Sequence, residues 1–446
     1  MPSTQSCALL AAAALLPLSA FGATVTSNAD SGEGTLRAAL EAGETTIEID
    51  PSVGDIDLDS PLVYAGREAL TLRGSGQTID GAGFGTDPIL TLADGASLKV
   101  SDLTFDAGGG DEDGPYERLV NEGGGKAIFI DVPLDATGVV SLAMRDVVVR
   151  GTGNHGVHVS DCVLDDGDPD ACGAGATGDG EGSDAGVRVH LVRVLIEESG
   201  FGKQDADGLR VDERGPGSIF FYSKDSTFYR VGADGVELDE GGVGRVAINV
   251  RDNAFIENGE FCLVGPFDPE DGDDPCNDDG EPDVDDGFDI DEEGPGSIVG
   301  YVISSQVVDN YDEGLDFDEA GSGGTNLHFY DIYSDGNEDE GIKVSEEDGG
   351  DNKAELVGVI TDGDLEFEEE GNGHIVVSLT DSAVGDDLQF EEADHGVVDI
   401  SIYDSIVADE VQVAADDGIE NTIDGYYKVR NSDIGDTDFE GYILEY

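Results

Sequence analysis

The segment Leu209-Arg210-Val211-Asp212-Glu213 decides the fold, because close variants of it recur along the second half of the chain. Each copy has two apolar residues separated by one other residue, followed by two residues that are mostly acidic. Further copies begin at Val236, Phe288, Leu315, Ile342, Leu365 and Leu388, and a weaker copy begins at Val411. Successive first positions are separated by 27, 52, 27, 27, 23, 23 and 23 residues. A period in this range indicates a repeat architecture, in which each unit buries its apolar side by stacking on the next.

Each repeat is expected to contain three short strands. Two apolar residues separated by one polar residue describe a strand with one buried side. Two more apolar positions follow, ten and nineteen residues after the first, as Ile219 and Phe228 follow Leu209. Three such strands, separated by Gly, Asp, Asn and Ser, fit one coil of a β-solenoid. An α-solenoid is excluded, because the chain contains 66 Gly and no sustained helical periodicity.

The repeat resembles the right-handed parallel β-helix of the pectate-lyase-like superfamily, in which coils of this length and the phrase Asn/Asp-x-Gly-apolar-x-apolar are typical. The N-terminal stretch 24–40, TVTSNADSGEGTLRAAL, is similar to the opening of secreted β-helix surface proteins, where a short helix caps the first coil. Thr35 is the expected N-cap of that helix. The resemblance implies an all-β, right-handed, single-stranded parallel β-helix over residues 24–446. It implies little about activity, since this fold carries lyases, hydrolases, esterases and non-catalytic adhesins.

The first 23 residues are expected to be a secretory signal peptide. Residues 8–18 form an apolar core, and Ala20-Phe21-Gly22 offers a small-x-small cleavage site. The segment departs from the usual pattern in having no Lys or Arg before this core. No later segment reaches the roughly 18 apolar residues that span a membrane. We therefore expect a secreted or cell-surface protein, with the periplasm as an alternative.

Four cysteines remain after export, in two close pairs, Cys162 with Cys172 and Cys262 with Cys276. Each pair flanks an Asp- and Gly-rich excursion, near residues 162–185 and 265–286, and the second excursion lies within the 52-residue spacing. The simplest interpretation is two local disulfides in an oxidising compartment. A metal–thiolate site is less favoured, because the chain has no Cys-x-x-Cys.

The charge of the chain limits its partners. With 101 Asp and Glu against 21 Lys and Arg, the formal net charge is −80. Nucleic acid and anionic membrane surfaces are excluded, because affinity for both comes from Lys and Arg. Two interpretations of the acid remain open and can coexist, namely adaptation to high salt and binding of cations.

The acidic residues of the repeats fall into columns, which favours ordered cation binding over a dispersed acidic surface. One column contains Asp212, Asp239, Asp291, Asp318, Ser345, Glu368 and Glu391, and the next contains Glu213, Glu240, Glu292, Glu319, Glu346, Glu369 and Glu392. A third column, at the strand position expected to be exposed, contains Arg210, Glu237, Asp289, Asp316, Lys343, Glu366 and Gln389. Like charges about 4.8 Å apart repel by about 0.9 kcal/mol per pair in bulk water. Bound Ca²⁺, high salt or raised carboxyl pKa values are the expected ways to offset this repulsion.

Calcium fits such columns, because it takes six to eight oxygen ligands in a flexible shell. The candidate ligands are Asp212, Asp239, Asp289, Asp291, Asp316, Asp318, Glu240, Glu292 and Glu319, together with Asp283 and Asp285 in the acidic segment before Phe288. The alternative for residues 283–291 is a solvated turn that enters a strand.

A catalytic site is the second possibility. Members of the resembled superfamily that cleave uronate polymers often pair Ca²⁺ with an Arg or Lys base. Lys224 and Arg251 are 27 residues apart and should stack, and Arg210 lies in the same region, so these three are the candidates. The alternative is that they neutralise nearby acids. His155 and His158 are expected on opposite sides of one strand, unable to share a site.

The sequence thus predicts a secreted, non-catalytic surface or matrix protein that binds divalent cations, Ca²⁺ in particular. An extracellular polysaccharide or another copy of the chain is the expected macromolecular partner. A calcium-dependent polysaccharide lyase that acts on an anionic glycan is the alternative.

Overall fold

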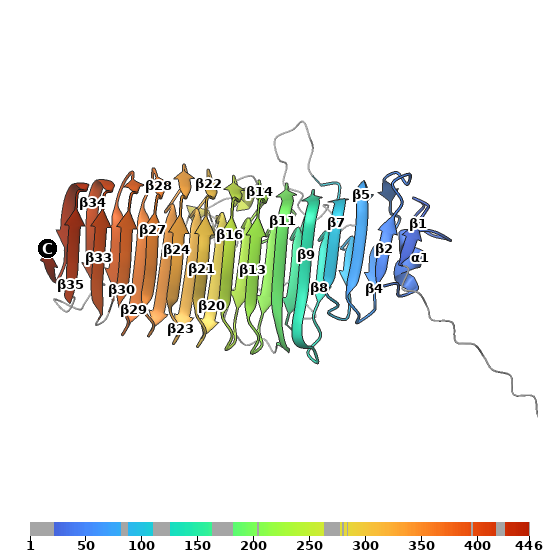
Figure 1. Cartoon of the computed structure of the whole chain (residues 1–446), viewed down its shortest axis with the longest axis horizontal. Coiled ribbons are helices and arrows are strands. Elements are labelled where there is room, and N and C mark those ends of the chain that lie inside the picture. The colour runs from blue at the N-terminus through green and yellow to red at the C-terminus, as the bar shows by residue number, and fades with distance from the viewer. Residues whose placement is uncertain are drawn as a thin grey trace, which may run out of the picture.

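The chain forms a right-handed parallel β-helix, as its repeats predict. The structure, a computed structural model, describes residues 22–81, 88–109, 125–162, 182–202, 205–262, 277–278, 281–282, 284–393, 396–415 and 424–445. Within them, 35 strands belong to one continuous sheet that winds around the axis, with parallel pairing throughout. Figure 1 shows the coils stacked into a rod, with the N-terminal coils in blue at one end and the C-terminal coils in red at the other.

The winding sheet has three faces, which are named here by their character. The acidic face contains β4 (Leu62–Tyr64), β6 (Leu90–Leu92), β8 (Ile128–Asp131), β10 (Val157–Asp161), β12 (Leu209–Glu213), β15 (Val236–Glu240), β20 (Phe288–Gly294), β23 (Leu315–Gly321), β26 (Ile342–Asp348), β29 (Leu365–Gly371), β32 (Leu388–Glu392) and the second parts of β34 (Ile406–Ala415) and β36 (Asp433–Phe439).

The broad face runs along the front of the rod in Figure 1. It contains β1 (Ala23–Val25), β2 (Thr46–Ile49), β5 (Leu70–Asp80), β7 (Leu98–Asp106), β9 (Thr137–Arg150), β11 (Asp184–Glu197), β13 (Ile219–Lys224), β16 (Val246–Arg251), β21 (Ile298–Ile303), β24 (Thr325–Tyr330), β27 (Asn352–Val357), β30 (Ile375–Thr380), β33 (Val397–Tyr403), β35 (Asp424–Arg430) and β37 (Tyr442–Glu445).

The narrow face contains β3 (Ile56–Asp57), the ends of β5, β7, β9 and β11, then β14 (Thr227–Tyr229), β17 (Ala254–Ile256), β22 (Gln306–Val308), β25 (Tyr333–Asp335), β28 (Ile360–Thr361), β31 (Ala383–Val384) and the first parts of β34 and β36. A separate antiparallel pair is formed by β18 (Asn277–Asp278) and β19 (Glu281–Pro282), and η1 is a 3₁₀ turn (Glu260–Cys262).

Coil length changes in one turn, between the narrow and acidic faces. This turn spans residues 309–314 before β23 and residues 336–341 before β26. It shortens to residues 362–364 before β29 and 385–387 before β32. The change from a 27-residue to a 23-residue repeat is therefore located at this corner of the coil.

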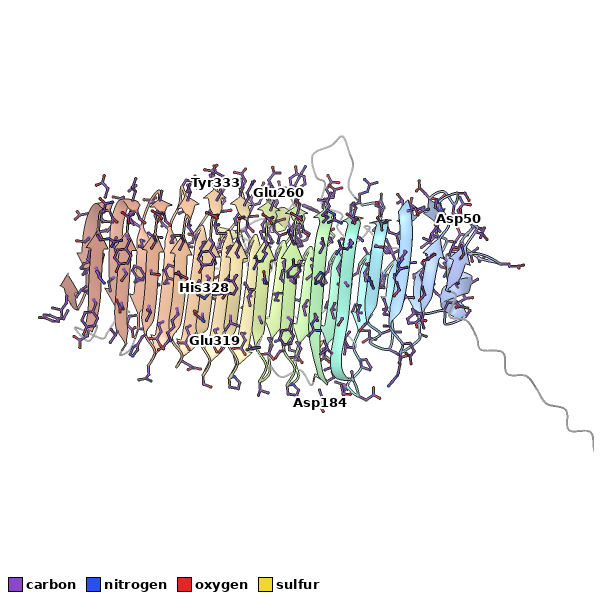
Figure 2. The ribbon with its side chains drawn as sticks, in the orientation of Figure 1. Asp50, Asp184, Glu260, Glu319, His328 and Tyr333 are labelled. Atoms are coloured by element: carbon purple, nitrogen blue, oxygen red, sulfur yellow. The ribbon has the colours of Figure 1, made fainter. Side chains whose placement is uncertain are left out.

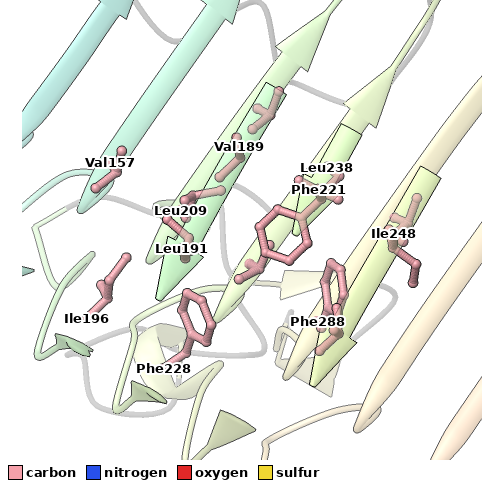
Figure 3. Close-up of a cluster of buried hydrophobic side chains, with 14 of the residues drawn as sticks. Val157, Val189, Leu191, Ile196, Leu209, Phe221, Phe228, Leu238, Ile248 and Phe288 are labelled. Carbon is pink, nitrogen blue, oxygen red and sulfur yellow. The ribbon is translucent and has the colours of Figure 1, made fainter. Parts of the chain in front are cut away.

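The interior of the β-helix is apolar and in register. The first and third positions of the repeats are fully buried, and in the copies that begin at Leu209 to Leu388 the positions ten and nineteen residues after the first are buried as well. Aromatic rings continue from coil to coil: the Phe228 and Phe255 centroids lie 5.2 Å apart, those of Phe255 and Phe288 5.4 Å, and those of Phe288 and Phe317 5.3 Å. Figure 3 shows part of this core around Phe228 and Phe288. Burial of these rings is a main contribution to stability.

The first coil is capped by the expected short helix, α1 (Leu36–Glu41). Thr35 is its N-cap, and its hydroxyl oxygen accepts a hydrogen bond from the Ala38 N–H at 3.2 Å. Leu36 and Leu40 are buried against the first coil. The helix thus covers the apolar end that the first strands would otherwise expose.

Truncation of the aromatic stack should destabilise the whole rod. Phe317 is fully buried and packs on Phe288 and Phe329. We expect Phe317→Ala to lower the free energy of unfolding by about 3–5 kcal/mol, because it removes the ring and leaves a cavity. Denaturant unfolding followed by far-ultraviolet circular dichroism measures this, with exposed Tyr333→Ala as the control. A loss below about 1 kcal/mol would contradict a close-packed interior at this coil.

Candidate metal centre

The Glu213 column faces the interior of the β-helix, whereas the other two columns face outward. Side chains alternate along a strand, so Glu213 lies on the same side as Leu209 and Val211, while Arg210 and Asp212 face outward. The seven glutamates at this position are buried, with exposed fractions of 0–1 %: Glu213, Glu240, Glu292, Glu319, Glu346, Glu369 and Glu392. Figure 2 shows Glu319 at the lower margin of the rod.

These glutamates cap the turn that follows their strand. The backbone N–H groups of Gly242 and Gly244 donate to Oε1 of Glu240 at 3.2 and 3.0 Å. Gly296 donates to Glu292 at 3.1 Å, and Gly323 to Glu319 at 3.0 Å, in the next two coils. A buried N–H needs such a partner. Glu240, Glu292 and Glu319, which were candidates for metal ligation, therefore each have one oxygen engaged in a turn.

The close stacking of these turns explains the recurring glycines. A Cβ atom at Gly244 would lie 1.6 Å from the carbonyl oxygen of Gly217 in the preceding coil, and one at Gly323 would lie 1.6 Å from that of Gly296. Neither position can accept a side chain without moving the backbone. The acid and the glycine of each repeat are thus two parts of the same turn.

Glu240, Glu292 and Glu319 carry protons at neutral pH. Burial raises the pKa of Glu240, Glu292 and Glu319 to about 8 each, and in each case a neighbouring glutamate adds to the shift. Oε2 of each is buried and receives no N–H hydrogen bond from the described residues. A protonated carboxyl can donate its O–H to the carboxyl of the next coil. Raised pKa values are thus one of the three offsets that the sequence led us to expect.

The outward side of the acidic face carries a second, different set of acids, named here the carboxylate grid. It has three rows of three, contributed by the turns and strands of β15, β20 and β23: Asp234, Glu237 and Asp239, then Asp286, Asp289 and Asp291, then Glu313, Asp316 and Asp318. Glu237, Asp289 and Asp316 are in register, as are Asp239, Asp291 and Asp318. Five of these nine residues were predicted ligands. Glu237 was not, and neither were Asp234, Asp286 and Glu313, which lie two residues before each strand.

Six of the nine grid residues are buried and Asp289, Asp291 and Asp318 are half-buried, which corrects the expectation that the central column is exposed. Glu237 is 6 % exposed, Asp239 1 % and Asp316 9 %. One cause is that the turn before each strand adds its own carboxylate to the same surface; the Asp286 N–H donates to Asp234 Oδ1 at 2.6 Å and ties successive turns together. Bulk water therefore does little to screen the charges of the grid.

Several carboxylates of this region approach closely enough to share a cation. Within each of three triplets, one oxygen per residue lies within 4.8 Å of the others: Glu237, Asp289 and Asp291; Asp286, Asp312 and Glu313; and Glu313, Asp339 and Glu340. Hard oxygen ligands in flexible arrangements suit Ca²⁺. The grid and its flanking acids thus form a row of adjoining candidate cation sites along the rod.

Oxygens of the grid lack hydrogen-bond partners. Among the described residues, none donates a hydrogen bond to Oδ1 of Asp239, Asp286, Asp316 or Asp318, although all four atoms are buried. Burial, followed by the charges of neighbouring carboxylates, holds the pKa values of Asp286 and Asp289 well above their usual range. Buried polar atoms are normally satisfied. Either protons or cations must therefore complete this part of the structure.

Two side-chain cations flank the grid, one at each end. The Arg210 guanidinium contacts Glu237, and it lies 3.4 Å from Asp239 Oδ2 and 2.9 Å from Asp212 Oδ1. At the other end, Lys343 Nζ lies 3.4 Å from Glu313 Oε1 and 3.8 Å from Asp316 Oδ2. Arg214 also pairs with Asp239. The middle row, Asp286, Asp289 and Asp291, has no Lys or Arg within ion-pair distance in the described parts of the chain.

A buried polar chain continues from Arg210 toward the N-terminus. Lys126 Nζ lies 2.6 Å from His158 Nδ1, and His158 Nε2 lies 2.5 Å from Asp212 Oδ2. Burial, then the Lys126 charge, lowers the pKa of His158 to about 3. A neutral His158 accepts from the ammonium and donates Nε2–H to Asp212. Burial alone would raise the pKa of Asp212, but Arg210 and His158 hold it well below its usual range.

His155 and His158 lie side by side, contrary to the expectation that they face opposite sides of a strand. Their ring centroids are 4.8 Å apart. The reason is that β10 begins only at Val157, so His155 belongs to the preceding turn and does not follow the strand alternation. His155 Nδ1 accepts from the Asp207 N–H at 2.9 Å. Asp207 and Lys126 were not singled out from the sequence, because their partners are distant in the chain.

The predicted basic candidates are divided between two faces. Lys224 and Arg251 are in register on the broad face, as expected from their spacing. Lys224 Nζ lies 3.8 Å from Asp225 and 3.9 Å from Asp252, and Arg251 Nε donates to Asn249 at 2.6 Å. Arg210 lies on β12 of the acidic face. The structure therefore does not bring Lys224 and Arg251 together with Arg210.

The remaining predicted positions are only partly described. Asp283 lies outside the described residues, while Asp285 is half-buried in the segment that leads to β20. Cys162 and Cys262 are buried, but their expected partners, Cys172 and Cys276, lie outside the described residues. The two disulfides stay predictions, as does the signal peptide, of which only residues 22 and 23 are described.

Comparison with protein-family models, curated proteins and solved structures finds no match to this chain. In the described residues, no helix has the length and apolar character needed to cross a membrane.

The buried glutamates make stability depend on pH. Their pKa is about 8 to 9 in the folded chain, for Glu240, Glu319 and Glu369 among others, against an ordinary value of 4.5. Folding therefore favours the protonated form, and this contribution is complete below about pH 4.5 and is lost as the pH rises through 8 to 9. We expect the melting temperature, measured in EDTA, to fall steadily from pH 5 to pH 9.

The variant Glu319→Gln tests the cause, because an amide has the shape of a protonated carboxyl and cannot ionise. Its melting temperature should fall less between pH 7 and pH 9 than that of the parent chain. Glu355→Gln on the exposed broad face serves as the control. A parent melting temperature that is constant or rises toward pH 9 would contradict a protonated glutamate column.

Proposed function

We propose that this protein is a secreted, non-catalytic β-helix protein that binds divalent cations, Ca²⁺ in particular, on the carboxylate grid. The observation that carries the proposal is the middle row of the grid, Asp286, Asp289 and Asp291, which is packed between two further acidic rows. Among the described residues, only Arg210, Arg214 and Lys343 form ion pairs with these nine carboxylates. Each divalent ion would neutralise two charges and supply partners for the buried oxygens.

Calcium binding accounts for the grid better than adaptation to high salt does. Salt adaptation needs acids that are exposed and hydrated, and it is consistent with the many exposed carboxylates elsewhere on the rod. It gives no reason to bury Asp239, Asp286 and Asp316. Protonation is the competing way to neutralise these side chains, and it would make the grid respond to pH and not to metal.

Macromolecular partners follow from the same chemistry. A chain with a net charge of −80 repels anionic polysaccharides and other copies of itself. Calcium at the acidic face would reduce this repulsion and could bridge to a carboxylate of a partner. We therefore propose an extracellular anionic glycan or a second copy of the chain as the partner, in a role that resembles the non-catalytic members of the pectate-lyase-like superfamily.

Calcium titration tests the proposal directly. We expect isothermal titration calorimetry of the chelator-treated protein to show saturable Ca²⁺ binding and a higher melting temperature at constant ionic strength. Asp289→Asn should weaken binding about tenfold or more, because it removes one ligand charge worth on the order of 1.4 kcal/mol. Asp399→Asn, an exposed acid on the broad face, should leave affinity unchanged.

The result that would count against the proposal is equally definite. A melting temperature that responds to NaCl and not to Ca²⁺, with no heat of calcium binding, would assign the acid to salt adaptation. Equal losses of affinity in Asp289→Asn and Asp399→Asn would show diffuse counterion binding without an ordered site.

A calcium-dependent polysaccharide lyase remains the second candidate, because one observation favours it. Lys126, His158 and Asp212 form a buried chain that links an amine to a carboxylate beside the grid. Arg210 suits the role of base poorly, because its carboxylate partners hold its pKa well above the usual value despite burial. Lys126 would be the base, His158 and Asp212 would position it, and calcium on the grid would bind the substrate carboxylate.

The lyase candidate predicts unsaturated product from polygalacturonate in the presence of Ca²⁺, followed by ultraviolet absorbance. Lys126→Met should abolish the reaction, while Lys224→Met, on the broad face, should retain it. The pH profile of His158→Gln should also shift, because the polar chain to Lys126 is altered. Product formation that survives Lys126→Met, or that is lost in Lys224→Met, would remove this assignment.

A further inference from the structure

Lys343 lies on the acidic face at a position that a carboxylate occupies in both neighbouring coils. It follows Asp289 and Asp316 in the same register column, and Glu366 comes after it. Its side chain is 25 % exposed, so the ammonium is partly enclosed. Nζ lies 3.4 Å from Glu313 Oε1 and 3.8 Å from Asp316 Oδ2. The ammonium therefore sits among oxygens from the preceding coil.

Glu313 is shared by two of the carboxylate triplets, one with Asp286 and Asp312, the other with Asp339 and Glu340. The ammonium of Lys343 thus lies at the junction of two candidate cation sites. Lysine presents a single compact charge that can take the place of an ion. Its contacts with Glu313 and Asp316 are longer than ideal hydrogen bonds, as expected where one ammonium interacts with several carboxylates.

A second observation indicates that the ammonium satisfies this site incompletely. Asp316 is 9 % exposed and directs Oδ2 toward Lys343, but its Oδ1 is buried and accepts no hydrogen bond within the described residues. Asp286 Oδ1, in the adjoining triplet, is in the same situation. One ammonium has three donors and a single charge. A divalent ion with six to eight coordination positions could use the oxygens that lysine leaves without a partner.

We infer that Lys343 occupies a divalent-cation position at the junction of two candidate sites, and that its removal opens one more calcium site that includes Glu313 and Asp316. This inference rests on the proposed function, since it assigns a stoichiometry to the same acidic face. Lys343 acts here as a built-in cation. Exchange of this ammonium for Ca²⁺ adds one positive charge to a region with an excess of negative charge.

The test compares the number of calcium ions bound by the full chain and by Lys343→Met, using isothermal titration calorimetry after removal of metal with a chelator. Methionine keeps the length and apolar stem of lysine but carries no charge. We expect the variant to bind one more Ca²⁺ than the parent. Lys343→Arg should leave the number unchanged, because it keeps a cation in place, and so should Lys353→Met, which removes an ammonium paired with Asp351 on the broad face.

The melting temperature provides a second readout, which also shows whether the variant has a folding defect. In EDTA, Lys343→Met should melt below the parent, because Glu313 and Asp316 lose their counter-charge. Millimolar Ca²⁺ should recover this difference, and the shift with calcium should exceed that of the parent. A variant that stays unfolded in millimolar Ca²⁺, or that folds and binds no additional ion, would overturn the inference.

Failure of this inference is distinguishable from failure of the proposed function. If the parent binds calcium and Lys343→Met binds no additional ion, only the proposed role of Lys343 is wrong. If the parent binds no calcium and the variant binds one ion, the proposed function is wrong and the role of Lys343 holds. Lysine would then fully occupy a cation site in a protein that does not use calcium. No binding by either would remove both.

Discussion

In-register parallel stacking is the constraint on which the rest of this structure depends. Each coil lies about 4.8 Å from the next, so every side chain faces its own counterpart. For Phe228 and Phe255, which are in register, this repetition is favourable, because flat rings stack on one another in the interior. For acids it is unfavourable, and the chain must neutralise each acidic column in some way.

The two sides of one strand solve this problem differently. On the inward side, Glu240, Glu292 and Glu319 are protonated, and each uses one oxygen to cap a turn whose glycine leaves room for the next coil. On the outward side, Arg210 and Lys343 provide fixed charges at the ends of the grid, and among the described residues no Lys or Arg lies within ion-pair distance of the middle row. Residues adjacent in sequence, such as Asp239 and Glu240, thus contribute to separate electrostatic systems.

The repeat spacing was enough to predict the β-helix and the three strands of each coil, because these depend on periodicity, while the Thr35 cap was predicted from the resemblance of the N-terminal stretch to other β-helix proteins. The candidate metal centre was harder to predict from the sequence. Strand alternation alone could have shown that Glu213 faces inward, and the regular acid two residues before each strand could have pointed to Asp234, Asp286 and Glu313. By contrast, the burial of the grid and the contact between Lys126 and His158 arise from segments distant in sequence, which no local pattern encodes.

The short turn before β29 has a consequence for how a β-helix of this kind can change in evolution. The longer turns supply the acid that lies two residues before each strand, up to Glu340. The shortened turns of residues 362–364 and 385–387 supply a different triplet, Asp364, Asp386 and Asp387, whose oxygens also lie within 4.8 Å of one another. A few residues inserted or deleted at one corner therefore decide which acids a coil contributes to the cation-binding surface. Because each coil contacts mainly its neighbours, duplication of a whole unit would lengthen that surface by one step without redesign of the remainder. The number of ions that the rod binds can thus change in evolution through the number of coils, separately from the affinity of any one site.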